Sequence, residues 1–362
     1  MYDACVIGAG INGCSVAYHL NKSGKRVALF DREAIGAGGS GAAGAFISPK
    51  FTKGGELKEL METAYLFSLD FYAKQFPSCI KNAPLLHIAK YEDEAQKLAA
   101  FKQNTALKIG TPPLHVTQIL TPLAQKSEKV YLLNGGVVDA KGVCREMVLG
   151  IDFFNAEVKS LVWREGYYEL GGIKAKEVIL SIGAYEPVVD EPYINLRGIW
   201  GHRIDIRTST RTEVTMHHYV SISKCQEGVM AIGATHDVHY HPQKNKEPYD
   251  IESGRAELLE KANMTIELKD VEVLNDYTGL RSGSNDYLPL VGRIVDAKKS
   301  GDEPVYRPNL YMINGVGGYG FVLAPFIAKQ LCEHIVSGKE IDPVMDPARF
   351  YKRYMKRQNS AR

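Results

Sequence analysis

Paired cysteines, long apolar runs and net charge are all scarce in this sequence. No two of the six cysteines have CxxC spacing, which is typical of scattered thiols in a reducing compartment, so we expect a cytoplasmic protein. No apolar run is long enough to span a bilayer, and the first residues lack the basic start of a signal peptide. With a net charge of +2 over 362 residues, any site for a polyanion must be a local patch.

The first thirty residues carry the clearest motif. A strand-like apolar stretch, residues 4–7, enters the turn Gly8-Ala9-Gly10-Ile11-Asn12-Gly13, and residues 15–22 have apolar side chains at helical spacing. A second strand-like stretch, residues 26–30, ends on Asp31. A strand, a glycine turn, a helix and an acid about 20 residues further on predict a dinucleotide site, against the alternative of an ordinary βα turn.

Each part of this motif has a mechanical reason. The first glycine permits the tight turn, the second lets the backbone approach a pyrophosphate, and the third lets helix and strand pack closely. The helix N-terminus holds the phosphates, and the acid accepts hydrogen bonds from ribose hydroxyls, which disfavours NADP. The predicted cofactor contacts here are Gly8, Gly10, Ile11, Asn12, Gly13, Asp31 and Arg32.

Further glycine-rich segments follow. Residues 36–45 favour a loop against which a flat ligand lies, the alternative being a flexible linker. A buried strand, residues 176–182, ends in Gly-Ala, which indicates either a cofactor contact or a plain turn. The predicted contacts in these segments are Gly39, Ser40, Ala43, Gly44, Ala45, Gly183 and Ala184.

A second strand, glycine turn and helix lie near the far end of the chain. Residues 310–314 are strand-like, residues 315–320 are glycine-rich, and residues 321–336 have helical spacing. Two such units favour a tightly held FAD, wrapped by both ends of the chain, over an exchangeable NAD. Residues 314–320 contain no Cys or His, so the FAD is expected to be non-covalent. The predicted contacts are Gly315, Gly317, Gly318, Tyr319 and Gly320.

The length and the pattern of elements predict two domains of α/β (α+β) class. We expect a discontinuous, Rossmann-like FAD-binding domain made of residues 1–78, 135–190 and 277–362. Residues 79–134 and 191–276 are expected to form a substrate domain, mainly an antiparallel β-sheet.

Taken together, these motifs resemble the D-amino-acid oxidase (DAO) superfamily of FAD-dependent oxidoreductases. The resemblance rests on both glycine turns, residues 39–44 and 179–184, and Gly279-Leu280-Arg281 with the segment 286–292. It implies an oxidoreductase acting on CH–NH groups, in which the flavin takes a hydride and no strong general base is required. We therefore assign no catalytic side chain. The resemblance also places Val158 among the cofactor contacts and Arg281 at both cofactor and substrate.

Within this superfamily the chain is similar to the flavin domain of the MnmC family of tRNA-modifying enzymes. Similar segments are residues 40–50, 232–236, 280–292 and 346–353. This implies oxidation of 5-carboxymethylaminomethyl(-2-thio)uridine at the tRNA wobble position to 5-aminomethyl(-2-thio)uridine with release of glyoxylate. The chain starts directly at the flavin turn, so methylation is expected to need a separate methyltransferase. The basic C-terminal tail, residues 349–362, would contact tRNA or form a solvated helix.

The substrate carboxylate must be bound by a cationic side chain. Arg281 is the first candidate, because a guanidinium can donate two parallel hydrogen bonds to a carboxylate. The alternative is a structural Arg paired with Asp276 or Asp286. Tyr219 is a second candidate, and Lys50 and Arg203 are weaker ones, expected to be solvated. The histidines of residues 236–241 lack a supporting cluster, so no metal is predicted.

Two other functions stay open. The first is a free amino-acid oxidase or dehydrogenase acting on glycine, sarcosine or D-amino acids. The second is a non-catalytic flavin- or RNA-binding protein. An open basic rim would favour tRNA, and a lidded pocket would favour a free amino acid.

Overall fold

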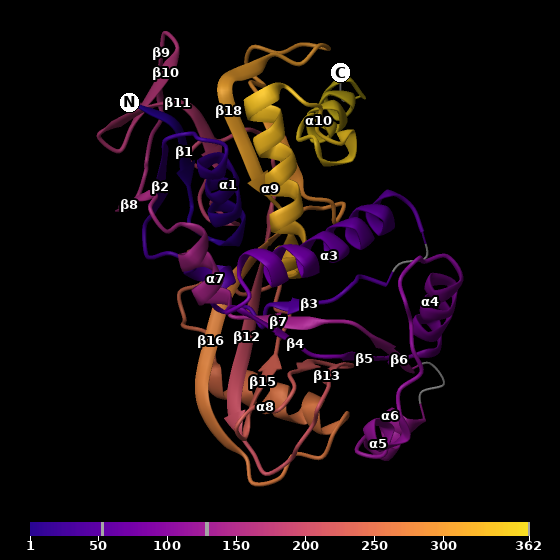
Figure 1. Ribbon diagram of the computed structural model, residues 1–362. Helices are drawn as coiled ribbons and strands as arrows, with labels where there is room; N and C mark the ends of the chain where they lie inside the picture. The colour runs from indigo at the N-terminus through magenta and orange to yellow at the C-terminus, as the bar shows by residue number, and fades with distance from the viewer. Residues whose placement is uncertain (52–53, 127–129, 361–362) are drawn as a thin grey trace. The chain divides into compact units, whose positions relative to one another are not determined.

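The computed structural model describes residues 1–51, 54–126 and 130–360, so Arg362 of the predicted basic tail lies outside the described residues. The chain divides into two compact units (Figure 1). Unit 1 comprises residues 1–41, 141–199 and 280–362, and unit 2 comprises residues 42–140 and 200–279. In the described part of the chain no helix has the length and apolar character needed to cross a membrane.

Unit 1 is built on a largely parallel sheet with the strand order β17-β18-β11-β1-β2-β8. Neighbouring strands from β18 to β8 pair in parallel, while β17 is antiparallel to β18 at one edge. The hairpin β9–β10 extends β11. The strands are β1 (Tyr2–Ile7), β2 (Val27–Asp31), β8 (Asp152–Asn155), β9 (Val162–Arg164), β10 (Tyr167–Leu170), β11 (Ile173–Leu180), β17 (Leu290–Val295) and β18 (Tyr306–Asn314).

Helices of unit 1 include the two that follow the predicted glycine turns. Helix α1 packs along α9, so elements from the two ends of the chain lie side by side (Figure 1). Helix α9 ends at Gly338, whose positive φ of 72° suits a glycine C-cap. The helices are α1 (Ile11–Lys22), α2 (Gly38–Gly41), α7 (Ala140–Met147), which begins at the unit boundary, α9 (Gly320–Ser337) and α10 (Ala348–Ser360), with short turns η1 (Gly317–Tyr319) and η2 (Pro343–Met345).

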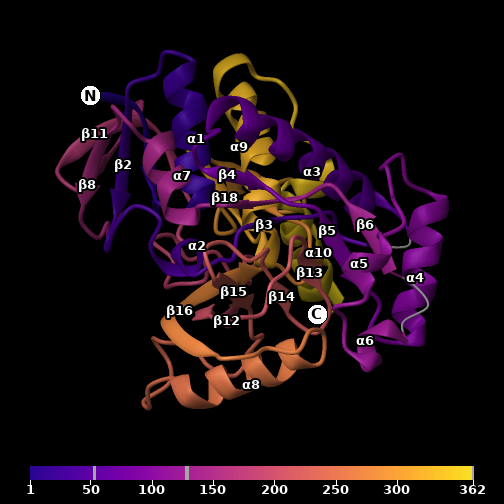
Figure 2. The same ribbon diagram turned by 60° about the horizontal axis from the view of Figure 1, so that its bottom comes forward.

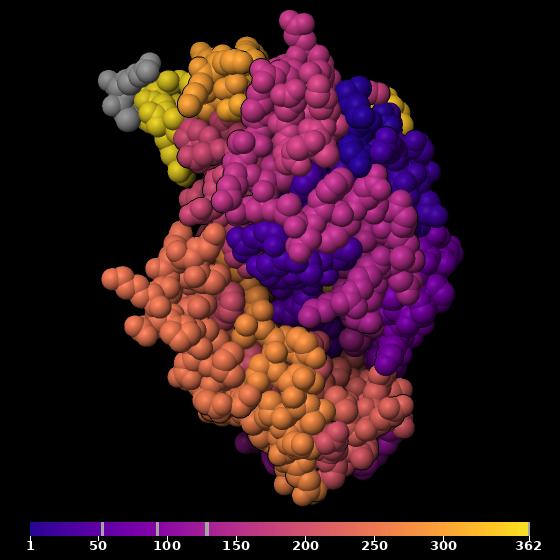
Figure 3. All heavy atoms as spheres, turned by 90° about the vertical axis from the view of Figure 1, so that its left-hand side faces the viewer, coloured from indigo at the N-terminus to yellow at the C-terminus, as the bar shows by residue number. Residues whose placement is uncertain are grey.

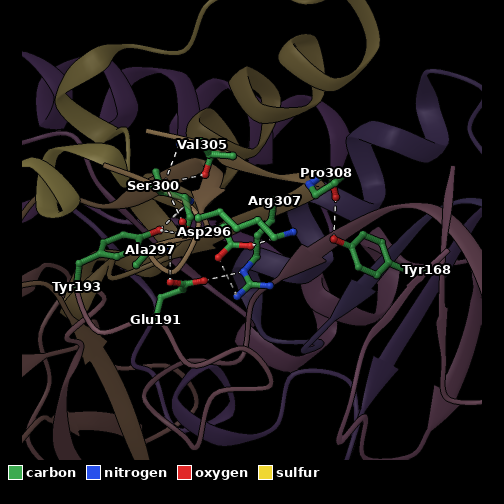
Figure 4. Close-up of polar contacts among 11 residues, drawn as sticks. Tyr168, Glu191, Tyr193, Asp296, Ala297, Ser300, Val305, Arg307 and Pro308 are labelled. Carbon is green, nitrogen blue, oxygen red and sulfur yellow. Dashed lines mark hydrogen bonds and ion pairs between the residues drawn. The ribbon is translucent and has the colours of Figure 1, made fainter. Parts of the chain in front are cut away.

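A buried ion-pair network fixes the segment ahead of β12 to the β17–β18 hairpin (Figure 4). Glu191, with a side chain only 1% exposed, accepts a hydrogen bond from Arg307 Nε at 2.6 Å. Asp296 lies 3.8 Å from the same guanidinium. The Tyr193 hydroxyl donates to the Val295 carbonyl at 3.1 Å and accepts from its N–H at 2.8 Å. Paired in this way, the buried carboxylates avoid the cost of isolated charges.

Unit 2 contains a seven-stranded sheet of order β16-β12-β15-β14-β13-β5-β6 and a small sheet β3-β7-β4 (Figure 2). The strands are β3 (Phe46–Ile47), β4 (Ile80–Asn82), β5 (Leu85–Ile88), β6 (Val130–Leu133), β7 (Gly136–Val138), β12 (Arg197–Arg207), β13 (Thr215–His217), β14 (Ser221–Ile222), β15 (Val229–Gly233) and β16 (Glu272–Gly283). The helices are α3 (Glu56–Gln75), α4 (Glu92–Gln103), α5 (Leu114–Thr117), α6 (Pro122–Gln125) and α8 (Ile251–Asn263).

The unit boundaries differ from the sequence-based domain ranges. Residues 42–78, expected in the FAD-binding domain, belong to unit 2. The reason lies in α3: Tyr65 donates to the Asn134 carbonyl at 2.7 Å, and Glu62 accepts from Thr105 at 2.7 Å. Residues 191–199, expected in the substrate domain, belong to unit 1. Residues 135–140 and 277–279, expected in the FAD-binding domain, belong to unit 2. Residues 280–362 belong to unit 1, the unit that carries both glycine turns.

Candidate functional site

The first glycine turn fits a dinucleotide because only glycine can occupy its key positions. Gly8 has a φ of +103°, and a Cβ there would lie 2.3 Å from the Ser181 carbonyl oxygen. A Cβ at Gly13 would lie 1.8 Å from the Gly8 carbonyl oxygen. These distances are far below van der Waals contact, so α1 can sit this close to β1 only with glycine at both positions.

The N-terminus of α1 is arranged to receive an anion. Its N-cap, Gly10, provides no side-chain cap, and the first turn carries no acid. The Ile11 N–H donates to Ser40 Oγ at 2.9 Å, and the Gly36 N–H donates to the Ala9 carbonyl at 2.8 Å. The glycine-rich loop is thereby held beside the helix end, where phosphate oxygens are favoured.

Asp31 lies at the end of β2, next to this turn. Its Oδ2 accepts from the Ala9 N–H at 2.7 Å, and its Oδ1 accepts from the Glu33 N–H at 2.9 Å. Each carboxylate oxygen keeps a second lone pair, so the group is oriented by the turn and still able to accept ribose hydroxyls. The guanidinium of the neighbouring Arg32 lies 3.9 Å from the ring centroid of Tyr185.

The ends of β11 and β18 bring the remaining predicted glycines to the same sheet edge. Asn314, the last residue of β18, donates from Nδ2 to the Gly183 carbonyl at 2.9 Å. Gly183, Gly315 and Gly317 all have positive φ, between 56° and 76°. A Cβ at Gly320 would lie 3.2 Å from Ile11 Cγ2, so the two glycine turns are neighbours.

The carboxyl ends of adjacent parallel strands therefore carry both glycine turns, Asp31 and the Gly183 turn. Dinucleotides bind at such an edge in open α/β sheets. The residues present fit FAD: a helix end with a glycine N-cap and no acid for the pyrophosphate, an oriented carboxylate for the ribose, and glycine backbone for close approach. Val158, also predicted as a contact, is 5% exposed in the hydrophobic cluster that includes Phe30 and Tyr168.

Arg281 lies near the end of β16, in the last four residues of that strand, which belong to unit 1, and its guanidinium is near the second glycine turn. A Cβ at Gly318 would lie 3.7 Å from Arg281 Nη1. Burial lowers the pKa of the Arg281 guanidinium from its ordinary value. Of the two acids considered as structural partners, Asp286 is bound by Arg349 and Arg353, and Asp276 is bound by Arg255 and His202.

The Gly36–Ala45 segment is divided between the units. Gly39 in unit 1 packs closely, since a Cβ there would lie 2.5 Å from the Leu280 carbonyl oxygen. Ala43, Gly44 and Ala45 belong to unit 2, where the Ala45 carbonyl accepts from the Val138 N–H at 3.0 Å.

The other predicted substrate residues, Tyr219, Lys50 and Arg203, lie in unit 2. The Tyr219 ring lies 4.3 Å from the ring of His218, between centroids. Burial lowers the pKa of the Lys50 ammonium. The Arg203 side chain is 15% exposed and lies over the Tyr277 ring at 4.0 Å, so the expectation that it is solvated was wrong.

Sequence reasoning missed a row of polar side chains across the sheet of unit 2. His87, His217, Ser221, Gly233 and Arg203 are successive partners on β5, β13, β14, β15 and β12, so they share one face. The alternate register positions, such as Met216 and Ile232, face the apolar cluster that includes Leu258 of α8. These residues are far apart in sequence, so the row becomes visible only from the pairing register of the strands.

Within this row the two histidines have buried Nε2 atoms without a hydrogen-bond partner in the described part of the chain. Their ring centroids lie 6.3 Å apart with an interplanar angle of 25°. Burial lowers the pKa of His217 to about 4 and that of His87 well below its ordinary value, so both rings are neutral at pH 7. The histidines of residues 236–241 lie elsewhere, and the described residues include no group of three or more potential metal ligands.

Comparison with known proteins bears on the family, the fold and the cofactor. The family model described as FAD dependent oxidoreductase (DAO) matches residues 3–334. The bifunctional protein MnmC of Marinobacter nauticus, named for tRNA 5-methylaminomethyl-2-thiouridine biosynthesis, is 23% identical over 91% of this chain and 55% of its own length. The chain thus spans little more than half of the MnmC proteins it matches. The uncharacterized oxidoreductase YurR of Bacillus subtilis is 24% identical, with 96% of this chain and 98% of YurR covered.

Among solved structures, the glycine oxidase of Geobacillus kaustophilus superposes with a TM-score of 0.79 at 18% identity. The match covers 95% of this chain and 98% of the oxidase. At this identity the likeness shows a common fold, a Rossmann-like FAD domain combined with a second β-rich domain.

Proposed function

Because the chain belongs to the DAO family of FAD-dependent oxidoreductases, we propose that it oxidises the carbon–nitrogen bond of a glycine-like secondary amine carried by tRNA. The proposed substrate is 5-carboxymethylaminomethyl(-2-thio)uridine at the wobble position. The products are 5-aminomethyl(-2-thio)uridine and glyoxylate. The similarity to several MnmC proteins supports the choice of tRNA.

The position of Arg281 is the observation that carries the proposal for the amine. Its guanidinium lies against the Gly315–Gly320 turn, so a carboxylate bound there lies beside the cofactor-binding edge. Bound FAD supplies the hydride acceptor. The protein binds the carboxylate, orients the adjacent C–H bond and keeps the cation in a poorly solvated setting. The substrate loses a hydride and a proton to give an imine, which water hydrolyses.

Further residues are proposed for the substrate and for the tRNA. In unit 2, Tyr219 is proposed to donate its hydroxyl to the substrate, and Lys50 and Arg203 are proposed to add positive charge. The exposed cations of α10 would contact tRNA phosphates. A methyltransferase would then complete the modification of the aminomethyl product.

The test is anaerobic mixing of the FAD-loaded protein with tRNA carrying the carboxymethylaminomethyl group, and separately with glycine, while flavin bleaching is followed. We expect bleaching by the tRNA with release of glyoxylate, and no bleaching by glycine at the same concentration. Bleaching by glycine alone would replace this proposal by the second candidate.

That second candidate is a free amino-acid oxidase or dehydrogenase. It is supported by the likeness to solved structures named glycine oxidase and L-proline dehydrogenase, the latter with a TM-score of 0.78 at 18% identity. Glycine, sarcosine and D-amino acids are the substrates to compare, since each presents an amine beside a carboxylate that Arg281 could bind.

A further inference from the structure

Tyr287 is an aromatic side chain displayed at the surface of unit 1. Its side chain and backbone together are 62% exposed, and it follows β16, the strand that carries Arg281. Its φ is +63°, in the left-handed region that bulky residues rarely adopt. Such a conformation is unfavourable for a residue with a Cβ and persists only where neighbouring residues enforce it. The exposure of this ring is therefore maintained against a local cost.

The residues on both sides of Tyr287 are clamped. Asp286 accepts two hydrogen bonds from Arg349 and a third from the Leu288 N–H at 3.3 Å. Arg349 also donates to the Leu288 carbonyl at 2.9 Å. Arg353, one turn further along α10, lies 3.0 Å from Asp286. The clamp fixes the backbone on both sides of Tyr287.

One cation lies over this ring, and the helix whose Arg349 and Arg353 bind Asp286 carries others. The Arg197 guanidinium lies 5.7 Å from the ring centroid and donates to the Ser284 carbonyl at 3.4 Å. Helix α10 contains no acid, and its exposed cations are Lys352, Arg353, Lys356 and Arg357. The atoms of α10 lie at the surface beside the segment around Gly301 (Figure 3). The Tyr351 hydroxyl of α10 donates to the Gly301 carbonyl. Asp302 and Glu303 are exposed acids next to that glycine.

We propose that Tyr287 is a stacking platform for an unpaired nucleobase of RNA, with Arg197 and the exposed cations of α10 binding the adjacent phosphates. Proteins recognise single-stranded RNA by stacking bases on aromatic rings and by pairing phosphates with cations. A membrane surface fits less well, because the apolar residues of α10, Phe350 and Tyr351, are buried in the core of unit 1. The inference rests on the proposed tRNA substrate, whose wobble base lies in an unpaired loop.

The experiment measures binding of a labelled anticodon stem-loop RNA to the FAD-loaded protein by fluorescence anisotropy at several salt concentrations. Tyr287→Gly should weaken binding by about 5- to 150-fold, the value of one base stack, without changing the salt dependence. The triple variant K352A/K356A/R357A should reduce the slope of log K against log salt by about 2. Tyr91→Ala, which removes a 63% exposed ring in unit 2, is the matched control and should bind like the wild type.

The melting temperature of Tyr287→Gly distinguishes a role in RNA binding from a role in stability. Glycine accepts a φ of +63° without strain, so Tyr287→Gly should melt at or above the wild-type temperature while losing RNA affinity. Wild-type affinity in Tyr287→Gly, or no binding of the stem-loop by the wild type, overturns the platform. Tyr287-dependent RNA binding without flavin bleaching by tRNA instead overturns the proposed reaction and leaves the platform standing.

Discussion

The Asp286 carboxylate receives two hydrogen bonds from one guanidinium, at 3.0 Å from Arg349 Nε and 3.1 Å from its Nη2. The two side chains are only 16% and 12% exposed, respectively. This pair joins α10 to the loop that follows the strand of Arg281. Well-aligned, shielded pairs of this kind contribute more than surface ion pairs do.

Asp286→Asn should lower the free energy of unfolding by about 1–3 kcal/mol at pH 7, because Arg349 loses its charged acceptor. Burial alone would raise the pKa of Asp286, but the hydrogen bonds and charge of Arg349 hold it below its ordinary value. The stabilisation is therefore complete above the unfolded pKa of about 3.9 and is lost as the pH falls through the folded pKa. Urea denaturation at pH 7 and at pH 3 measures this. An equal difference between wild type and variant at both values would contradict it.

His19 should make the stability of the protein fall in mild acid. Burial lowers its pKa to about 4, and its Nε2 lies 3.1 Å from the Pro325 carbonyl, to which it donates when the ring is neutral. Protonation favours the unfolded chain, so stability is complete above pH 6.5 and falls toward pH 4, by on the order of 3 kcal/mol. His19→Gln keeps a donor for the carbonyl and should flatten this slope in denaturation experiments from pH 4 to 7. An unchanged slope would show that His19 does not titrate there.

Gly13→Ala should abolish FAD binding, because the new Cβ would lie 1.8 Å from the Gly8 carbonyl oxygen and push α1 away from β1. Gly301→Ala is the control, since nothing lies within 4 Å of a Cβ at that position. The ratio of flavin to protein after purification, read by absorbance, reports the result. A Gly13→Ala protein with full flavin content would mean that the turn tolerates displacement of the helix.

Arg281→Ala should reduce kcat/KM for a carboxylate-bearing amine by about 10²–10³-fold, because the substrate loses a charged, two-pronged partner. Arg281→Lys should recover part of this loss, since it restores the charge without the fork. An amine lacking the carboxylate should react equally with wild type and Arg281→Ala. Unchanged kinetics with the carboxylated substrate would remove Arg281 from the site.

Most helices of the fold could be predicted because their signals are local. The helix expected at residues 321–336 is α9 (Gly320–Ser337), which is capped by Gly338. Strand boundaries are less local, because pairing sets them: β8 is Asp152–Asn155, the residues that pair with β2. The boundaries of the two compact units also differ from the expected domain ranges, since α3 is held in unit 2 by contacts with distant residues such as Asn134.

The same distinction applies to the candidate site. Glycine turns are encoded in a few consecutive residues, so their positions at one sheet edge could be anticipated from strand, turn and helix order. The His87–His217 pair could not, because it depends on the register of two strands about 130 residues apart in sequence. The clamp on Tyr287 was likewise invisible, since Arg349 is distant in sequence from Asp286.

Because α1 packs against α9, the cofactor-binding edge of the sheet can be completed only after α9 has been synthesised. The glycine turn after β1 emerges from the ribosome roughly three hundred residues before β18 and α9, which complete the same sheet edge. At about 5–20 residues per second, the nascent chain waits at least some fifteen seconds with an unfinished pocket. Cofactor capture is therefore a late step, and a ribosome that stalls before β18 would release a chain unable to retain its flavin.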